Sequence, residues 1–290
     1  MCLKTLSSLL IGLHALGYGT AALSAQDPNL NAPAAVVMRT SYAALSEQLR
    51  TSPFGRPLLL SSTETPARLG GEVYAVVDYR FDVVESGLSQ PQHWCEVLLL
   101  HINTKFCRAS VTPLAATLTV FVGKKTPQEL ATATRIEFEF ATLAHTPEYL
   151  ALEMTAGDGP LGTSDYVIRL EAIPISKGQS FVHLTYAYAT HLAARLAMQT
   201  YLLTGGAGKV GFTVDGGVRG MVERNTMRYY LAVASYLEFV GVAPPQTQFE
   251  RRLSSWYSAV ERYPRQLHDL ERDEYLSMKR SEFARQGAAP

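Results

Sequence analysis

The stretch from Asp165 to Thr190 constrains the fold of this chain more than any other. Two runs of alternating residues lie here, joined by a short polar turn and followed directly by helical sequence. The residues that share one face are Tyr166, Ile168 and Leu170 in the first run and Val182, Leu184, Tyr186 and Tyr188 in the second. A period of two predicts strands, here an antiparallel hairpin. A curved antiparallel sheet that leads into a long helix is one way to build a cavity.

The first 25 residues differ from the rest of the chain. Lys4 precedes an apolar run, and small residues stand before Gln26, a pattern typical of a cleaved secretory signal peptide. A single membrane anchor is the alternative, but the run is too short to span about 30 Å of hydrocarbon well. Cys2 precedes the apolar run, which does not fit a lipoprotein leader. Because no later segment is long and apolar enough to cross a membrane, we expect an exported, periplasmic protein.

The charge balance argues against nucleic acid as a partner. Removing residues 1–25 takes away Lys4 and no acid, which leaves 25 basic and 26 acidic residues from the original 26 of each. Binding to phosphates requires a basic face, whereas here the cations are spread among acids.

Two cysteines, Cys95 and Cys107, remain after the signal peptide. Cysteines this close commonly pair in an oxidising compartment, and helical sequence around Cys95 followed by a strand at Cys107 allows a turn to bring them together. Two free thiols are the alternative. His93 and His101 lie nearby, but no cluster of further ligands completes a metal site, and we expect neither a metal nor a cofactor.

Periodicity assigns the remaining elements. Helices are predicted at residues 34–50, 81–88, 92–101, 191–204 and 218–240, and further strands at 72–81, 118–122, 135–143, 149–154 and 209–214. Residues 58–60 are predicted to form only a short extended segment. Six or seven strands with a helical interruption are too few for a closed lipocalin-like barrel.

The end of the chain carries an apolar seam from Phe249 to Leu270. Its members, at alternating spacings of four and three residues, are Phe249, Leu253, Trp256, Val260, Tyr263, Leu267 and Leu270. The seam either folds back onto its own domain or docks a partner protein of the cell envelope.

The order of elements from Gly71 to Val240 resembles the START-like superfamily, the helix-grip fold of polyketide cyclases and lipid-transfer domains. The segment from Phe81 to Trp94 is also similar to the small helices of that superfamily. The resemblance implies an α+β fold in which a curved antiparallel sheet grips a long C-terminal helix around a ligand cavity. The insertion between Thr190 and Gly217, which splits the closing helix, departs from this pattern.

The chain also resembles uncharacterised exported proteins of Gram-negative bacteria through the blocks at residues 159–166 and 223–230, which implies a periplasmic setting. The domain organisation that follows is a signal peptide (1–25), an N-terminal helix and lead-in (26–66), a helix-grip domain (67–243) and a C-terminal helical extension (244–290).

Candidate ligand-binding residues lie on the hairpin and on the helices. The expected set is Trp94, Tyr166, Arg169, His183, Tyr186, Tyr188, Asn225 and Arg228. Aromatic rings supply apolar area and polar tips set orientation, although rings at strand spacing are also what a plain core requires. His183 alternates away from Tyr186, so both cannot face one cavity. Asn225 and Arg228 either hold a polar group of the ligand or belong to a structural network.

Enzymatic signatures are weak. The sequence has no G-x-S-x-G elbow, no H-E-x-x-H and no P-loop. His145, Glu148 and Glu153 are the residues that a cyclase-like or hydrolytic enzyme would use for proton transfer, as would His183 beside a carboxylate. The expected function is therefore binding of a hydrophobic or amphipathic small molecule, possibly a lipid, without catalysis. The alternatives are an envelope interaction module and an enzyme.

Overall fold

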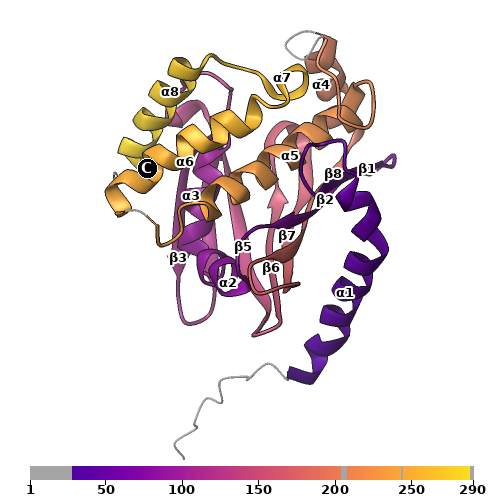
Figure 1. Cartoon of the computed structure of the whole chain (residues 1–290). Helices are drawn as coiled ribbons and strands as arrows, with labels where there is room; N and C mark the ends of the chain where they lie inside the picture. The colour runs from indigo at the N-terminus through magenta and orange to yellow at the C-terminus, as the bar shows by residue number, and fades with distance from the viewer. Residues whose placement is uncertain (1–27, 204–207, 243, 288–290) are drawn as a thin grey trace, which may run out of the picture.

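The computed structural model describes residues 28–203, 208–242 and 244–287 (Figure 1). The predicted signal peptide at residues 1–25 lies outside them. No helix in these ranges is long and apolar enough to cross a membrane.

An eight-stranded sheet and eight α-helices make up the described part of the chain. The strands are β1 (Leu58–Glu64), β2 (Arg68–Val77), β3 (Thr104–Val111), β4 (Ala116–Val122), β5 (Thr134–Thr146), β6 (Tyr149–Asp158), β7 (Thr163–Pro174) and β8 (Ser180–Thr190). The helices are α1 (Pro28–Arg50), α2 (Phe81–Leu88), α3 (Pro91–Leu100), α4 (Leu192–Leu203), α5 (Gly217–Leu237), α6 (Pro245–Val260), α7 (Pro264–Leu267) and α8 (Arg272–Ala284).

The sheet is antiparallel throughout and open. Its order is β1-β2-β8-β7-β6-β5-β4-β3, with β1 and β3 at the edges. The predicted hairpin is the pair β7 and β8, which lies in the interior of the sheet. The sequence underestimated the strand count because the segment that begins at Leu58 pairs with β2 along its whole length.

The inner face of the sheet is covered by α5, which crosses it in Figure 1, and by α3. Alternate strand residues such as Val73, Ile168 and Leu184 are buried there against Met227 and Leu231 of α5. With α2 and α3 between β2 and β3, and α5 after the last strand, this is a sheet that grips a helix. The predicted α+β fold class is therefore confirmed.

Gly71 of β2 sets how closely α5 approaches the sheet. A Cβ at this position would lie 2.2 Å from Oγ1 and 3.0 Å from Cβ of Thr226 on α5. We expect Gly71→Ala to lower the free energy of unfolding by about 1 to 3 kcal/mol, as overpacking does elsewhere. Urea unfolding measures the loss, with Gly157→Ala as the matched control, because no atom lies within 4 Å of a Cβ there. Adding Thr226→Ala should recover part of the loss, and no recovery would contradict the assigned contact.

The outer face of the sheet is covered in part by α1. Met38 and Leu49 of this helix pack with Tyr149, Ile173 and Phe181 in a second, smaller hydrophobic cluster. The predicted helix at residues 34–50 is therefore correct but begins earlier, at Pro28.

The C-terminal helices fold back onto the domain. Leu253, Trp256, Val260 and Leu267 of the seam are buried in the main core. The central residues of the seam therefore pack against their own domain, which was the first of the two predicted alternatives.

The predicted disulfide is present and joins Cys95 of α3 to Cys107 of β3. The predicted strand at residues 209–214 is wrong. These residues form an irregular segment with bends, because the Glu223 carboxylate of α5 accepts hydrogen bonds from the backbone N–H groups of Phe212 (2.6 Å) and Thr213 (2.9 Å) and thereby satisfies them locally.

Candidate functional site

Four tyrosines meet between the sheet and α5. Tyr166, Tyr186 and Tyr188 come from the hairpin, as predicted, and Tyr229 comes from α5. The ring centroids of Tyr166 and Tyr188 lie 5.1 Å apart, and that of Tyr186 lies 5.5 Å from Tyr188 and 5.0 Å from Tyr229. The rings form one continuous aromatic surface, which we call the tyrosine cluster.

Two hydroxyls of the tyrosine cluster lack a partner. The hydroxyl of Tyr166 lies 2.6 Å from Oγ1 of Thr163, but those of Tyr188 and Tyr229 form no hydrogen bond with another described residue. Burial raises the pKa of both tyrosines, so both hydroxyls stay protonated. Neither oxygen is among the fully buried side-chain atoms that lack a partner, so both hydroxyls stay accessible to solvent or to a ligand.

His101, just after α3, extends this set. Its ring stacks on Tyr229 with centroids 4.6 Å apart. Nδ1 accepts a hydrogen bond from the N–H of Asn103 (3.2 Å), which places the proton on Nε2, and Nε2 is buried without a partner among the described residues. Burial, then the charges of Arg228, Lys279 and Lys125, lower the pKa of His101 well below its usual value. The imidazole is thus a neutral donor.

The predicted residues of α5 have partners inside the chain. Arg228, 1% exposed, donates to Asp269 (2.5 Å) and at 3.4 Å to the side-chain oxygen of Asn225. Trp94 is buried in the core, where its indole N–H donates to the carbonyl of Leu88 (2.9 Å).

His183 and Arg169 lie on the outer face instead. His183 stacks on Tyr74 (4.1 Å), and its ring nitrogens lie 3.3 Å from Glu171 and 3.9 Å from Glu72. Arg169 lies 3.7 Å from the same Glu171 carboxylate. The strand alternation that separated His183 from Tyr186 in the sequence is confirmed.

Protonation of His183 should stabilise the fold. Burial opposes the charged form, but hydrogen bonds with Glu171 and Glu72 outweigh it and raise the pKa of His183. The resulting stability is complete below the unfolded pKa of about 6.5 and is lost as pH rises through the higher folded pKa.

We therefore expect His183→Gln to lower the free energy of unfolding by on the order of 1 kcal/mol at pH 5.5 and by less at pH 9. Urea unfolding at both pH values measures the difference. The control is His191→Gln, at an exposed position. An equal loss at both pH values would show that His183 acts only by packing.

A surface pocket of about 690 Å³ lies beside α2, next to the turns that follow β5 and β7. His145 Nε2 is in hydrogen-bonding contact with the Glu85 carboxylate at its edge. The other predicted proton-transfer residues are elsewhere, since Glu148 pairs with Arg39 of α1 (2.6 Å) and Glu153 pairs in register with Arg169 on β7. The predicted trio is therefore not assembled, although a histidine beside a carboxylate is.

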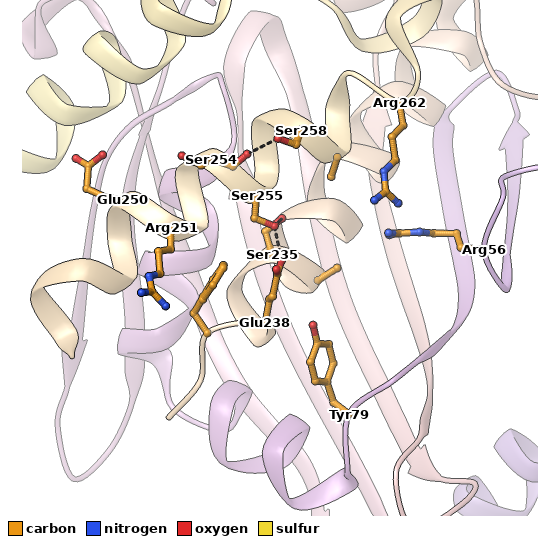
Figure 2. Close-up of a pocket in the computed structure, with 13 residues that line it drawn as sticks. Arg56, Tyr79, Ser235, Glu238, Glu250, Arg251, Ser254, Ser255, Ser258 and Arg262 are labelled. Atoms are coloured by element: carbon orange, nitrogen blue, oxygen red, sulfur yellow. Dashed lines mark hydrogen bonds between the residues drawn. The ribbon is translucent and has the colours of Figure 1, made fainter. Parts of the chain in front are cut away.

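A second surface pocket, of about 600 Å³, lies between α6 and the end of α5 (Figure 2). Arg56 and Arg262 extend toward the same part of it, with Tyr79 below. Glu238 and Glu250 also line the pocket, and Glu238 accepts a hydrogen bond from Ser255 (2.5 Å). The mixture of arginines and glutamates favours no single ligand charge.

No protein-family model matches the sequence, and no curated protein matches it. Solved structures do match. A truncated norcoclaurine synthase from Thalictrum flavum is 12% identical over 63% of this chain and 99% of its own (TM-score 0.37). Human StAR-related lipid transfer protein 5 is 9% identical over 71% and 97% (TM-score 0.35). The Zhui aromatase/cyclase from Streptomyces sp. R1128 is 10% identical over 68% and 95% (TM-score 0.33). All three TM-scores are below 0.5, and the sheet that grips a helix is established by the strand order and the contacts of this chain itself.

Sequence reasoning missed Tyr229 and His101. Tyr229 lay within the predicted helix at residues 218–240 without a role of its own, and His101 was considered only as a metal ligand. A histidine at the end of the predicted helix at residues 92–101 was the available signal, because a buried imidazole N–H requires a partner.

Proposed function

We propose that the protein binds a hydrophobic or amphipathic small molecule between the inner face of the sheet and α5, without catalysis. The observation that carries the proposal is the buried, unpaired Nε2 of His101, whose ring stacks on Tyr229 at the edge of the tyrosine cluster. Buried polar groups in folded proteins are ordinarily hydrogen-bonded, so a group left unpaired calls for a partner from outside the chain.

The tyrosine cluster suits such a ligand in two respects. Its rings offer a large apolar surface, and Tyr229 keeps partial solvent accessibility despite its position under the sheet. Its hydroxyls donate or accept, while the Nε2–H of His101 only donates. A ligand with an apolar body and an oxygen-bearing end can pack on the rings and accept a hydrogen bond from these groups.

Export to the periplasm is part of the proposal. It is supported by the leader pattern in residues 1–25 and by the disulfide between Cys95 and Cys107, since disulfides persist mainly in oxidising compartments.

Binding can be tested with 1-dodecanol, a neutral amphiphile, in competition with the apolar dye N-phenyl-1-naphthylamine on residues 26–290. We expect Tyr188→Phe and Tyr229→Phe to fold as stably as the wild type and to bind dodecanol about 5- to 10-fold more weakly, the range of one lost hydrogen bond. Tyr42→Phe is the matched control, because Tyr42 packs on Phe181 at the outer face. Failure of the wild type to bind, or equal binding by all variants, would overturn the proposal.

Proton-transfer catalysis at His145 is the second candidate. It is favoured by the contact of His145 with Glu85 at the edge of a pocket, the geometry in which a carboxylate orients a basic imidazole. Hydrolysis of p-nitrophenyl esters would support it if His145→Gln and Glu85→Gln each abolished the activity, and turnover unchanged by both variants would exclude it.

A further inference from the structure

We infer that the ligand is an anion, with a carboxylate or phosphate head group held by Arg228, Lys125 and Lys209 next to His101. The inference rests on the proposed function, because it assigns the chemical class of the molecule bound at the tyrosine cluster.

These three cations surround one carboxylate. Asp269 Oδ1 lies 2.7 Å from Lys125 and 3.4 Å from Lys209, and Oδ2 lies 2.5 Å from Arg228. The side chains of Arg228 and Asp269 are 1% and 5% exposed. The group has two more positive charges than negative ones, and its Arg228–Asp269 pair is excluded from water.

The imbalance extends to the other side of His101. The carboxylate of Glu282 is shared by Lys105 (2.9 Å) and Lys279 (2.7 Å), and Lys279 also donates to the carbonyl of His101 (2.7 Å). All three side chains of this triad are at most 2% exposed. Both sides of the imidazole thus carry an excess of buried positive charge.

Burial of unneutralised charge is costly, and a fold that retains it gains from a counter-ion. The cost of this charge is reflected in the two lysines. Burial lowers the pKa of Lys279 to about 8. Burial, together with the neighbouring charge of Arg228, lowers the pKa of Lys125 to about 8 as well. An anion bound here would restore the ordinary protonation of Lys125.

Two donors of this region have no acceptor. Nε of Arg228 and Nε2 of His101 are buried and have no partner among the described residues. Both residues are no more than 3% exposed, so water does not reach these donors freely. Charge-assisted hydrogen bonds from such donors to an anionic oxygen are about twice as strong as neutral ones.

His101 links the tyrosine cluster to the cationic group. Tyr229 lies between Tyr186, 5.0 Å away, and His101, 4.6 Å away, and the charges of Arg228 and Lys125 act on that imidazole. The side chains of Lys125 and Lys209, 25% and 24% exposed, connect the group to solvent. An amphiphile can therefore place its tail along the tyrosines and its acidic head beside His101.

The test compares ligands of one chain length. We expect dodecyl phosphate and dodecanoate to bind the wild type at least 10-fold more tightly than dodecanol, with inorganic phosphate alone at least 10-fold weaker than dodecyl phosphate. Lys125→Gln/Lys209→Gln should reduce the preference for the anions to less than 3-fold, and urea unfolding reports whether the variant is folded. Lys124→Gln, at the neighbouring exposed position, is the control and should keep the preference.

Each outcome has a distinct meaning. Equal affinity of dodecanol and the two anions would overturn the inference and leave the proposed function standing. If inorganic phosphate binds as tightly as dodecyl phosphate, the cations bind a free anion, and the inference that the ligand is an amphiphile is overturned. Failure of dodecanol and of both anions to bind would overturn the proposed function together with this inference.

Discussion

Replacing Glu282 by glutamine is expected to lower the free energy of unfolding by about 3 to 5 kcal/mol at pH 7, the range for removing one partner of a buried ion pair. The substitution leaves the ammonium groups of Lys105 and Lys279 without a carboxylate in a site that is at most 2% exposed. Urea unfolding at pH 7 measures the loss. The matched control is Glu250→Gln, which removes an exposed pair with Arg280 on the same helix, α8, and should cost about 0 to 1 kcal/mol.

The pH dependence of this loss identifies its cause. Burial lowers the pKa of Lys279 to about 8, so the folded state releases this proton before the unfolded state does, and stability contributed by Lys279 rises with pH from about 8 to the unfolded pKa of about 10.4. Once Lys279 is neutral, the carboxylate keeps only the ammonium of Lys105 as a charged partner. The difference between wild type and Glu282→Gln should therefore shrink between pH 7 and pH 10, and a constant difference would mean that Glu282 acts through its shape alone.

Loss of the disulfide is the second large effect expected. Cys95→Ser/Cys107→Ser opens a loop between residues 12 positions apart, and in the chain-entropy picture this lowers the free energy of unfolding by about 3 kcal/mol. Calorimetry on the oxidised wild type and the double variant measures the change. Dithiothreitol should lower the melting temperature of the wild type toward that of the variant and leave the variant unchanged. A wild type that is indifferent to reductant would contradict a stabilising bridge.

The hairpin shows what local pattern can predict. Strand alternation alone separates Tyr166, Tyr186 and Tyr188 from His183, because successive side chains of a strand point to opposite faces. The structure keeps this separation, and the two sets lie on the inner and outer faces of the sheet. The fold class followed from the same periodicity together with the order of the elements.

The partners of the polar residues were not accessible in the same way. Arg228 finds Asp269, 41 residues away, and Lys105 finds Glu282, 177 residues away. Such pairs depend on where the C-terminal helices pack against the rest of the chain. The spacing of the seam predicts which face of those helices is apolar, but it does not predict which residues pack on that face. Tyr229 and His101 join the site for the same reason, since only the packing of α5 beside α3 brings them together.

The buried residues of α8 also have a consequence for local opening of the structure. Lys279 donates to the carbonyl of His101 (2.7 Å) and Tyr275 donates to that of Leu100 (2.9 Å), so the end of α3 is held by side chains more than 170 residues away in the sequence. Helices can open locally while the core of a protein stays folded. Opening of α8 would therefore release the imidazole beside Tyr229 and leave the sheet and α5 in place.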